Sequence, residues 1–309
     1  MRIKFIINQS SGSQDHDLQI EEICRMLEER HVLEVFYTEK KDDATLATDD
    51  AIRDGVDLLI VSGGDGTVNE IANSIGDKRS QLPVAILSNG TVNDFSKFLE
   101  MPSDPKDFVE MIENCNTIDV DLGRINDSYF VNVAAMGTAS NIAHEVDKET
   151  KARFGAMAYY LQGLRKLPEL LTESMHLRLQ SGEFHFEGEA MLLVISNTKS
   201  IGGFTNLAPE ADLSDGKFDV LLIKKTNFFS IADVFFKSLT GEHTENEDVL
   251  YFQTERLTVE SLSQNEVEID IDGEHGGILP IQFSTIPRGF RVVVNNKNKG
   301  SDPSVITNY

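Results

Sequence analysis

Short apolar runs alternate with amphipathic segments along the first third of the chain. Four runs have the length and composition of buried strands, and they lie at residues 3–8, 33–38, 58–62 and 84–87. Between them, residues 18–29 and 45–53 repeat apolar side chains every three or four positions, as one face of a helix does. Strands that alternate with helices are typical of a parallel sheet covered by helices. The pattern therefore predicts an N-terminal α/β domain.

The pattern changes near residue 123. From Tyr129 onward most apolar runs are short and separated by turn residues, which is typical of antiparallel sheet. They lie at residues 129–134, 176–180, 184–186, 191–196, 218–223, 256–259, 267–271 and 281–283. Helical patterns at residues 154–171 and 228–239 interrupt them. We therefore expect a mainly antiparallel β-sandwich with a few helices at 124–294, after an α/β domain at 1–123.

The polar tail 295–309 leaves two alternatives open: it is loose, or it returns to the first domain. The chain has 309 residues, of which 40% are hydrophobic, enough to build a core in each domain. Its 28 Lys and Arg against 51 Asp and Glu give a net charge of −23. This balance argues against nucleic-acid binding, whose affinity comes largely from basic side chains on phosphates, and against a polybasic membrane anchor.

The cysteines, the N-terminus and the uncharged stretches indicate a cytoplasmic protein. Cys24 and Cys115 form no CxxC pair, so the sequence predicts neither a zinc site nor a disulfide framework. The apolar run after Met1 is too short for a signal peptide. The uncharged stretch at residues 128–144 is shorter than the ~18 apolar residues of a spanning helix.

A glycine-rich turn follows the third predicted strand. It reads Gly63-Gly64-Asp65-Gly66-Thr67-Val68-Asn69-Glu70 and leads into a helix start. Glycines let backbone N–H groups approach a phosphate, and a helix N-terminus adds partial positive charge. The Asp65 carboxylate would need a divalent ion between itself and the phosphate, so the motif points to a metal-bridged nucleotide. The plainer alternative is a turn in which Asp65 caps the helix.

A second turn of related composition follows the fourth predicted strand. It reads Gly90-Thr91-Val92-Asn93-Asp94-Phe95. Thr91 has the residue type of an N-cap, and Asp94 stands three residues on, at the spacing of a reciprocal capping pair. Because ligands of open α/β sheets bind beyond the carboxyl ends of the strands, we expect this turn, the Gly63 turn and the turn after Asn8 to meet at one edge.

Together these two motifs resemble the catalytic domain shared by diacylglycerol kinases, sphingosine kinases and the bacterial soluble lipid kinases. Residues 209–219, Pro-Glu-Ala-Asp-Leu-Ser-Asp-Gly-Lys-Phe-Asp, are similar to the metal loop of that family, and Asp272-Gly273-Glu274 to its Asp-Gly-Glu signature. The resemblance covers nearly the whole chain. It implies a first domain like that of phosphofructokinases and NAD kinases, and a second domain with the metal loop, the general base and the lipid-facing cleft.

The resemblance also implies roles for individual residues. Glu274 would be the general base and Asp65 would act on the phosphates through Mg²⁺, while Asp94 would support its loop. Asp215, with main-chain oxygens of Asp212 and Lys217, would hold a second, structural Mg²⁺. ATP would be bound by residues of four segments: Asn8, Gln9, Ser10, Ser11 and Gly12; Thr38; Gly64, Asp65, Gly66, Thr67, Val68, Asn69 and Glu70; Thr91 and Asp94.

One position departs from the family pattern. Members usually have Asn-Pro-x-Ser/Ala-Gly after the first strand, whereas this chain has Gln9 where the proline would stand. The fixed φ angle of proline is therefore lost from this turn. The departure bears on the rigidity of the loop more than on its location.

The resemblance predicts an ATP- and Mg²⁺-dependent kinase that phosphorylates a free hydroxyl of a lipid such as diacylglycerol. A kinase for a soluble acceptor such as NAD and a non-catalytic nucleotide- or lipid-binding protein are the alternatives. A homodimer is left open. Contact with a membrane is expected to be transient, through the basic, aromatic segment 148–166 or through Lys224–Phe229 and Phe235–Lys237, although burial of these helices on their own domain is the more common arrangement.

Overall fold

The computed structural model describes residues 1–9, 14–78, 81–90, 93–137, 174–202, 204 and 206–295. The chain divides into two compact units, Met1–Leu122 with Ile286–Tyr309, and Gly123–Thr285. Several predictions fall outside the described residues: the roles of Ser10, Ser11, Gly12 and Thr91, the helix at 154–171, the basic segment 148–166 and, beyond Asn295, the polar tail.

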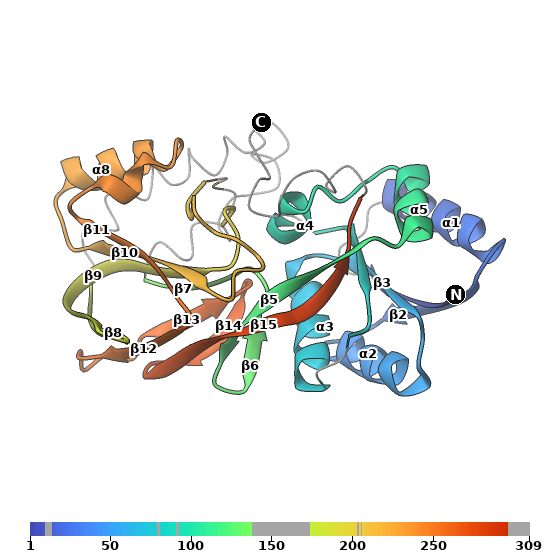
Figure 1. Ribbon diagram of the computed structural model, residues 1–309, viewed down its shortest axis with the longest axis horizontal. Helices are drawn as coiled ribbons and strands as arrows, with labels where there is room; N and C mark the ends of the chain where they lie inside the picture. Colours follow the sequence, from blue (N-terminus) through green and yellow to red (C-terminus); the bar gives the residue numbers. More distant parts are fainter. Residues whose placement is uncertain are drawn as a thin grey trace. The chain divides into compact units, whose positions relative to one another are not determined.

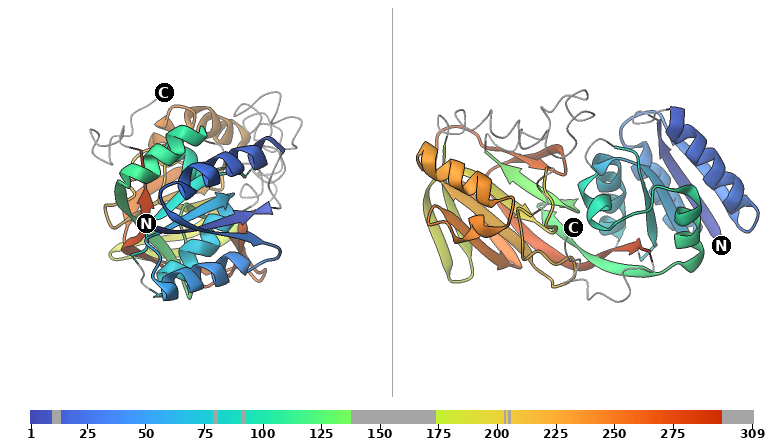
Figure 2. Two further views of the ribbon diagram at one scale, coloured as in Figure 1. Left: turned by 90° about the vertical axis from the view of Figure 1, so that its right-hand side faces the viewer. Right: turned by 90° about the horizontal axis from the view of Figure 1, so that it is seen from above.

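The first unit is a parallel sheet with helices on both faces, as predicted. Its elements are β1 (Arg2–Asn8), α1 (Gln14–Glu28), β2 (Val32–Thr38), α2 (Asp43–Asp54), β3 (Leu58–Gly63), α3 (Asp65–Lys78), β4 (Val84–Ser88), α4 (Asp94–Phe98) and α5 (Pro105–Asn114). The strands run β4-β3-β1-β2, all parallel. Figures 1 and 2 show α1 and α5 on one face of the sheet, with α2 and α3 on the other.

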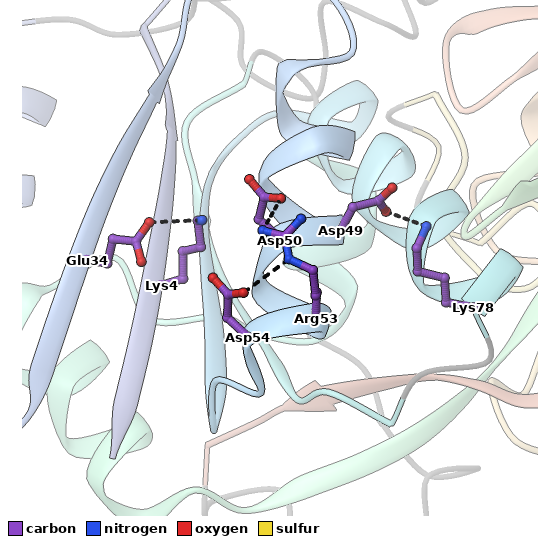
Figure 3. A network of polar contacts seen from close by, with 7 residues as sticks. All are labelled: Lys4, Glu34, Asp49, Asp50, Arg53, Asp54 and Lys78. Atoms are coloured by element: carbon purple, nitrogen blue, oxygen red, sulfur yellow. Dashed lines mark hydrogen bonds and ion pairs between the residues drawn. The ribbon is translucent and has the colours of Figure 1, made fainter.

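The two faces of this sheet are held differently. Ile3, Phe5 and Ile7 of β1 pack with apolar residues of α1 and α5 in one buried cluster. The ion pairs on the other face (Figure 3) include Lys4 to Glu34 of β2, at 2.9 Å, and Lys78 of α3 to Asp49 of α2, at 2.6 Å. Ser74 of α3 also donates a hydrogen bond to Asp49. These contacts fix α3, whose first turn carries the glycine motif, against its neighbouring helix.

The second unit is the predicted antiparallel β-sandwich. Its elements are β6 (Ser128–Phe130), β7 (Val133–Met136), β8 (Met175–Ser181), β9 (Phe184–Ser196), β10 (Phe218–Lys224), α8 (Phe228–Lys237), a 3₁₀ helix at Glu242–Glu245, β11 (Val249–Thr254), β12 (Arg256–Ser261), β13 (Glu268–Ile271) and β14 (Glu274–Ile278). The pairings among these strands are antiparallel. One apolar cluster includes Phe130, Phe218 and Phe283, and another lies between β10 and α8.

Two strand predictions were wrong in their extent. The run at 129–134 divides into β6 and β7, because the backbone N–H groups of Val131, Asn132 and Val133 bond to the side chain of Asp272. The runs at 184–186 and 191–196 form one strand, β9, whose polar middle still pairs with β8 and whose end pairs with β7 and β10.

Both chain crossings between the units occur inside strands. β5 (Thr117–Ile125) passes the boundary after Leu122, and β15 (Ile281–Val293) passes it before Ile286. The two strands pair with each other. Within the first unit, Arg291 of β15 donates two hydrogen bonds to the carboxylate of Asp119 in β5, at 2.6 and 3.1 Å. The backbone N–H of Arg288 bonds to Asp121 at 2.7 Å.

Replacement of Asp119 by Asn should destabilise the protein near neutral pH but not in acid. Hydrogen bonds from Arg291, together with the charges of Arg291 and Arg288, hold the pKa of Asp119 below its usual value of 3.8 despite partial burial. A depressed carboxyl pKa contributes stability above the unfolded-state pKa, and that contribution is lost as pH falls through the folded-state value. In urea denaturation, Asp119→Asn should therefore have a lower free energy of unfolding than wild type at neutral pH. This difference should disappear below about pH 4.

The matched control is Asp127→Asn. Asp127 is fully exposed and lies 3.7 Å from Arg124, so this exposed pair should contribute almost nothing at any pH. A difference in the free energy of unfolding between Asp119→Asn and wild type that stayed constant with pH would contradict a depressed pKa of Asp119 as its cause.

Candidate active site

The carboxyl ends of four parallel strands meet at one edge of the first unit. Asn8, the last residue of β1, stands opposite Thr38, the last residue of β2. Gly63 of β3 stands opposite Ser88, the last residue of β4. The structure therefore brings Asn8, Thr38, the Gly63 turn and the Gly90 turn to the same edge, as the sequence indicates.

The first glycine turn is tight because side chains are excluded from it. α3 begins at Asp65, directly after β3, and the N–H of Val68 bonds to the carbonyl of Gly64 at 3.1 Å. A Cβ atom on Gly63 would lie 2.6 Å from the Cβ of Thr67, closer than side-chain carbons can approach. The side-chain amide of Asn8 donates to the hydroxyl of Thr67 at 2.8 Å. The end of β1 is thus tied to the first turn of α3.

Of the α3 residues predicted to bind ATP, Thr67, Val68 and Asn69 are buried. Asp65, Gly66 and Glu70 are partly exposed, as is Gly64 just before the helix. α3 is 14 residues long, so its N-terminus places the partial positive charge of a helix end at this edge. A half-exposed carboxylate beside such a helix end suits a phosphate group only if a cation lies between them.

The second turn rests directly on the first. A Cβ on Gly90 would lie 2.5 Å from the Cα of Gly64, so the two glycine backbones are in contact. The N–H of Asn89 bonds to the carbonyl of Gly63 at 2.9 Å. Asn93 closes the turn, since its side chain accepts from the N–H of Gly90 and donates to the Gly90 carbonyl, both at 2.9 Å. The two turns therefore form one packed unit.

The predicted capping pair is not formed as expected. α4 begins at Asp94, so its N-cap is Asn93 rather than Thr91. Asn93 has a φ of 54° and uses its side chain on Gly90 instead of the helix. Left-handed backbone is tolerated by asparagine better than by most residues, which accounts for its place here. Asp94 is buried in the first helical turn.

In the second unit, the side chain of Asp272 binds three consecutive backbone N–H groups. Its buried carboxylate accepts from the N–H groups of Val131, Asn132 and Val133, at 2.7, 3.0 and 2.8 Å. The Asp272 N–H in turn bonds to the carbonyl of Val133 at 2.9 Å. The Asp-Gly-Glu segment is therefore clamped to the link between β6 and β7.

Glu274 follows this clamp as the first, exposed residue of β14. Asp272 and Gly273 both have positive φ, 50° and 90°, and make the two-residue turn between β13 and β14. The segment is thus a hairpin turn, the plainer alternative for this motif, and the same turn presents Glu274. An exposed carboxylate on an anchored turn can accept a proton from a hydroxyl group brought to it.

The Asp-rich loop precedes β10 and is folded by local hydrogen bonds. Asp212 accepts from the N–H and hydroxyl of Ser214, at 2.8 and 2.9 Å, and Asp215 accepts from the N–H of Lys217 at 2.9 Å. After the loop, burial raises the pKa of Asp219 to about 7. The charges of Asp215 and Glu210 add to this rise, whereas hydrogen bonds from Tyr251 and Gln253 oppose it. The carboxylates of Asp215 and Glu210 therefore lie close enough to Asp219 to act on it.

Within the described parts of the chain, no cluster of three or more His, Cys, Asp or Glu side chains is arranged to hold a metal ion. The expected Mg²⁺ site in the loop is of another kind, because it combines one carboxylate, Asp215, with main-chain oxygens of Asp212 and Lys217. Oxygen donors of this sort suit Mg²⁺ and Ca²⁺. The donor chemistry therefore fits the ion.

Sequence reasoning missed two groups that position the site. His16 of α1 and Ser62 of β3 form a buried hydrogen bond of 2.8 Å just before the first glycine turn. Asn132, Ser196 and Thr198 are linked by hydrogen bonds beside the Asp272 clamp. No local sequence pattern predicts these bonds. Ser196 and Thr198 are close in sequence, but every other bonded pair is 46 or more residues apart.

Two family models match the chain, one in its N-terminal part and one in its C-terminal part. The diacylglycerol kinase catalytic domain model matches residues 2–125, and the YegS C-terminal NAD kinase beta sandwich-like domain model matches residues 132–294. A Staphylococcus aureus diacylglycerol kinase is 32% identical over 96% of this chain and 93% of its own length. The chain belongs to the diacylglycerol kinase family. It is a kinase, and the family resemblance drawn from its motifs is confirmed.

Other relatives of the family support the same assignment. A Staphylococcus haemolyticus diacylglycerol kinase is 32% identical over 94% of this chain and 87% of its own length. A crystal structure of a putative diacylglycerol kinase from Bacillus anthracis has a TM-score of 0.80 at 26% identity, covering 96% of both chains. Among the helices that the structure describes, none is long and apolar enough to cross a membrane.

Replacement of Gly90 by Ala should impair nucleotide binding. The added methyl group would meet Gly64 and the Asn93 side chain, both at 2.5 Å, and push the two turns apart. We expect ATP affinity to fall at least about tenfold, a change of ~1.4 kcal/mol, in calorimetric titration. Gly188→Ala is the control, because its Cβ would meet only the ring of Phe186, at 3.1 Å or more. Equal ATP affinity in both variants would contradict the role of the contact.

Proposed function

We propose that this member of the diacylglycerol kinase family transfers the γ-phosphoryl group of ATP to a free hydroxyl of a diacylglycerol-like lipid. The observation that carries the proposal is the packed pair of turns, in which Gly64 and Gly90 touch at the carboxyl edge of a parallel sheet. The helix N-terminus at Asp65 adds a site for phosphate. The relatives named above are diacylglycerol kinases, which supports a lipid acceptor.

ATP is proposed to bind at this edge, against Asn8, Thr38, the Gly64–Glu70 segment and the turn that holds Asp94. Asp65 would hold Mg²⁺ on the phosphates, and Asp215 with main-chain oxygens of Asp212 and Lys217 would hold a second, structural Mg²⁺. Bound Mg²⁺ would neutralise charge on the phosphate oxygens. Gln9 lies beside Asn8, so we assign it to the same binding segment.

Glu274 is proposed as the general base of the transfer. Its carboxylate would take the proton of the acceptor hydroxyl while that oxygen forms a bond to the γ-phosphorus and the bond to ADP breaks. Two features support the choice: the carboxylate is exposed, and the three hydrogen bonds to Asp272 fix the turn that precedes it. A rigid turn limits the orientations of Glu274.

Replacement of Glu274 by Gln should lower kcat by about 10²–10⁴-fold and leave ATP affinity unchanged, because only the proton acceptor is lost. Asp65→Asn should instead weaken Mg²⁺-dependent ATP binding. Both are measured by transfer of labelled phosphate from ATP to diacylglycerol in mixed micelles, with NAD offered as a competing soluble acceptor.

The control for this experiment is Glu268→Gln, which removes an exposed carboxylate from the same hairpin. It should leave turnover unchanged. Transfer to NAD but not to lipid would favour the soluble-acceptor alternative, which the NAD kinase-like second domain keeps open. ATP binding without transfer to either acceptor would favour a non-catalytic protein.

A lipid acceptor requires contact with a membrane, and we assign that contact to α8. Figure 1 shows α8 at the periphery of the second unit. Ile231 and Val234 of this helix face the core, whereas Phe229 is 83% exposed, Phe236 56% and Phe228 46%. Phe229 and Phe236 are seven residues apart, two turns along the same face. Aromatic side chains on one face of a surface helix suit the interfacial layer of a bilayer.

The lysines near α8 contribute little to this contact. Lys237 pairs with Asp233 at 2.8 Å, and Lys225 pairs with Glu189 at 2.9 Å. Glu242 and Glu245 also act on Lys237. Among the described residues, both of these lysines are paired with acids, so we propose an attraction of α8 to lipid that is apolar rather than electrostatic. This differs from a basic patch, whose binding weakens as salt rises.

The double variant Phe229→Ser, Phe236→Ser should bind vesicles of neutral phospholipid and diacylglycerol at least about a hundredfold more weakly, since each buried phenyl ring contributes ~1.5 kcal/mol or more and the two together ~3 kcal/mol. Sedimentation with vesicles measures this, and raised salt should not weaken wild-type binding. Leu46→Ser is the control, because Leu46 is an exposed apolar residue of α2. Unchanged vesicle binding by the double variant would contradict a role of α8 in membrane contact. Kinase activity on a short-chain acceptor is measured separately, to test whether the variant is still active.

A further inference from the structure

The turn between β1 and α1 is flanked by two side-chain hydrogen bonds that end on the same neighbour. Before the turn, Asn8 donates to Thr67 at 2.8 Å. After it, the Nε2 atom of His16 lies 2.8 Å from the hydroxyl of Ser62. Ser62 and Thr67 stand on either side of the Gly63–Gly66 turn, so the β1–α1 turn is tied to the β3–α3 turn at both of its ends.

The bond between His16 and Ser62 is inside the protein. His16 is the third residue of α1 and is buried, and Ser62 is fully buried in β3. β1 leads into α1, and Ser62 belongs to the neighbouring strand β3, where it stands opposite Ile7 of β1. The bond therefore links α1 to the strand next to β1. Burial lowers the pKa of His16, although a hydrogen bond with Gln19 and the charge of Asp17 oppose the shift. Loss of either partner would leave a buried polar group unsatisfied.

The sequence of the connecting segment explains why two ties matter. It contains Gly12 and three serines between Gln9 and Gln14, and no proline. A sequence without proline fixes no φ angle through a ring, so the two ends of the segment are positioned by the bonds of Asn8 and His16. Groups that are positioned before the ligand arrives lose less entropy on binding.

We infer that His16 is a positioning residue for nucleotide binding, which acts through Ser62 to hold the start of α1 against the β3–α3 turn. This inference rests on the proposed function, because it assumes that these turns bind ATP. His16 itself is buried and acts on the ligand only through the turns. The same geometry assigns Ser62 the role of its anchor.

Three variants test the role, with binding of a non-hydrolysable ATP analogue measured by calorimetry. His16→Ala and Ser62→Ala each remove the bond, and we expect each to weaken analogue binding about 3–10-fold, the range for one hydrogen bond. The KM for ATP should rise by the same factor, with kcat changed less than about twofold. His16→Gln retains an amide that can bond to Ser62 and should recover most of the affinity.

His243→Ala is the matched control. His243 is fully buried in the second unit and bonds to the carbonyl of Leu207 at 3.0 Å, so its loss should lower thermal stability without changing analogue affinity. A second arm adds Gln9→Pro to His16→Ala. Proline restricts the backbone of the turn, and the preceding Asn8 is already extended, as proline requires. Partial recovery of analogue affinity is expected.

The outcomes separate the inference from the proposed function. Analogue affinity unchanged in both His16→Ala and Ser62→Ala, with stability lowered as in His243→Ala, would overturn the positioning role. No analogue binding by the wild-type protein would instead contradict the proposed function. Because Ser62→Ala removes a single oxygen atom, it keeps the test decisive if His16→Ala fails to fold.

Discussion

The candidate site depends on one constraint, the contact between the backbones of Gly64 and Gly90. Gly90 has no room for a side chain, because a Cβ there would lie 2.5 Å from the Cα of Gly64, and a Cβ on Gly64 would be crowded at 3.1 Å from the Cα of Gly90. The contact lets two separate βα turns act as one surface, and Asn93 then closes the second turn with two hydrogen bonds. A packing restriction of this kind brings the two turns closer to each other at the α3 terminus than side chains at these positions would allow.

The second unit reaches a comparable rigidity by another route. There a buried carboxylate, Asp272, satisfies three consecutive N–H groups in the link between β6 and β7. Buried polar networks of this type stabilise a structure only when all members are satisfied, and they then specify one conformation. The first unit thus positions its loops through close contact between glycine backbones, whereas the second unit uses one buried carboxylate, Asp272.

Much of this architecture could be predicted from local sequence. The apolar runs identify β1, β3 and β4 because these strands are buried along nearly their whole length. β2 is only partly buried, and its apolar composition identifies it. The glycine turns are visible because close backbone contact needs glycine. The division between β6 and β7 could not be predicted, since its cause is Asp272, about 140 residues away. The bond from His16 to Ser62 is hidden for the same reason. The outer face of α8 was misleading in another way, because phenylalanine is usually buried, yet Phe229 is not.

Strand β15 has a consequence for how the chain folds during synthesis. Its residues beyond Thr285 group with the first unit, and Val292 pairs with β4 at the edge of the parallel sheet. The second unit is therefore an insertion within the first, and all of its residues leave the ribosome before the last strand of the first sheet does. Domains usually fold as units during synthesis. The inserted unit is therefore synthesised while the N-terminal sheet still has an unpaired edge at β4, and β15 covers that edge last.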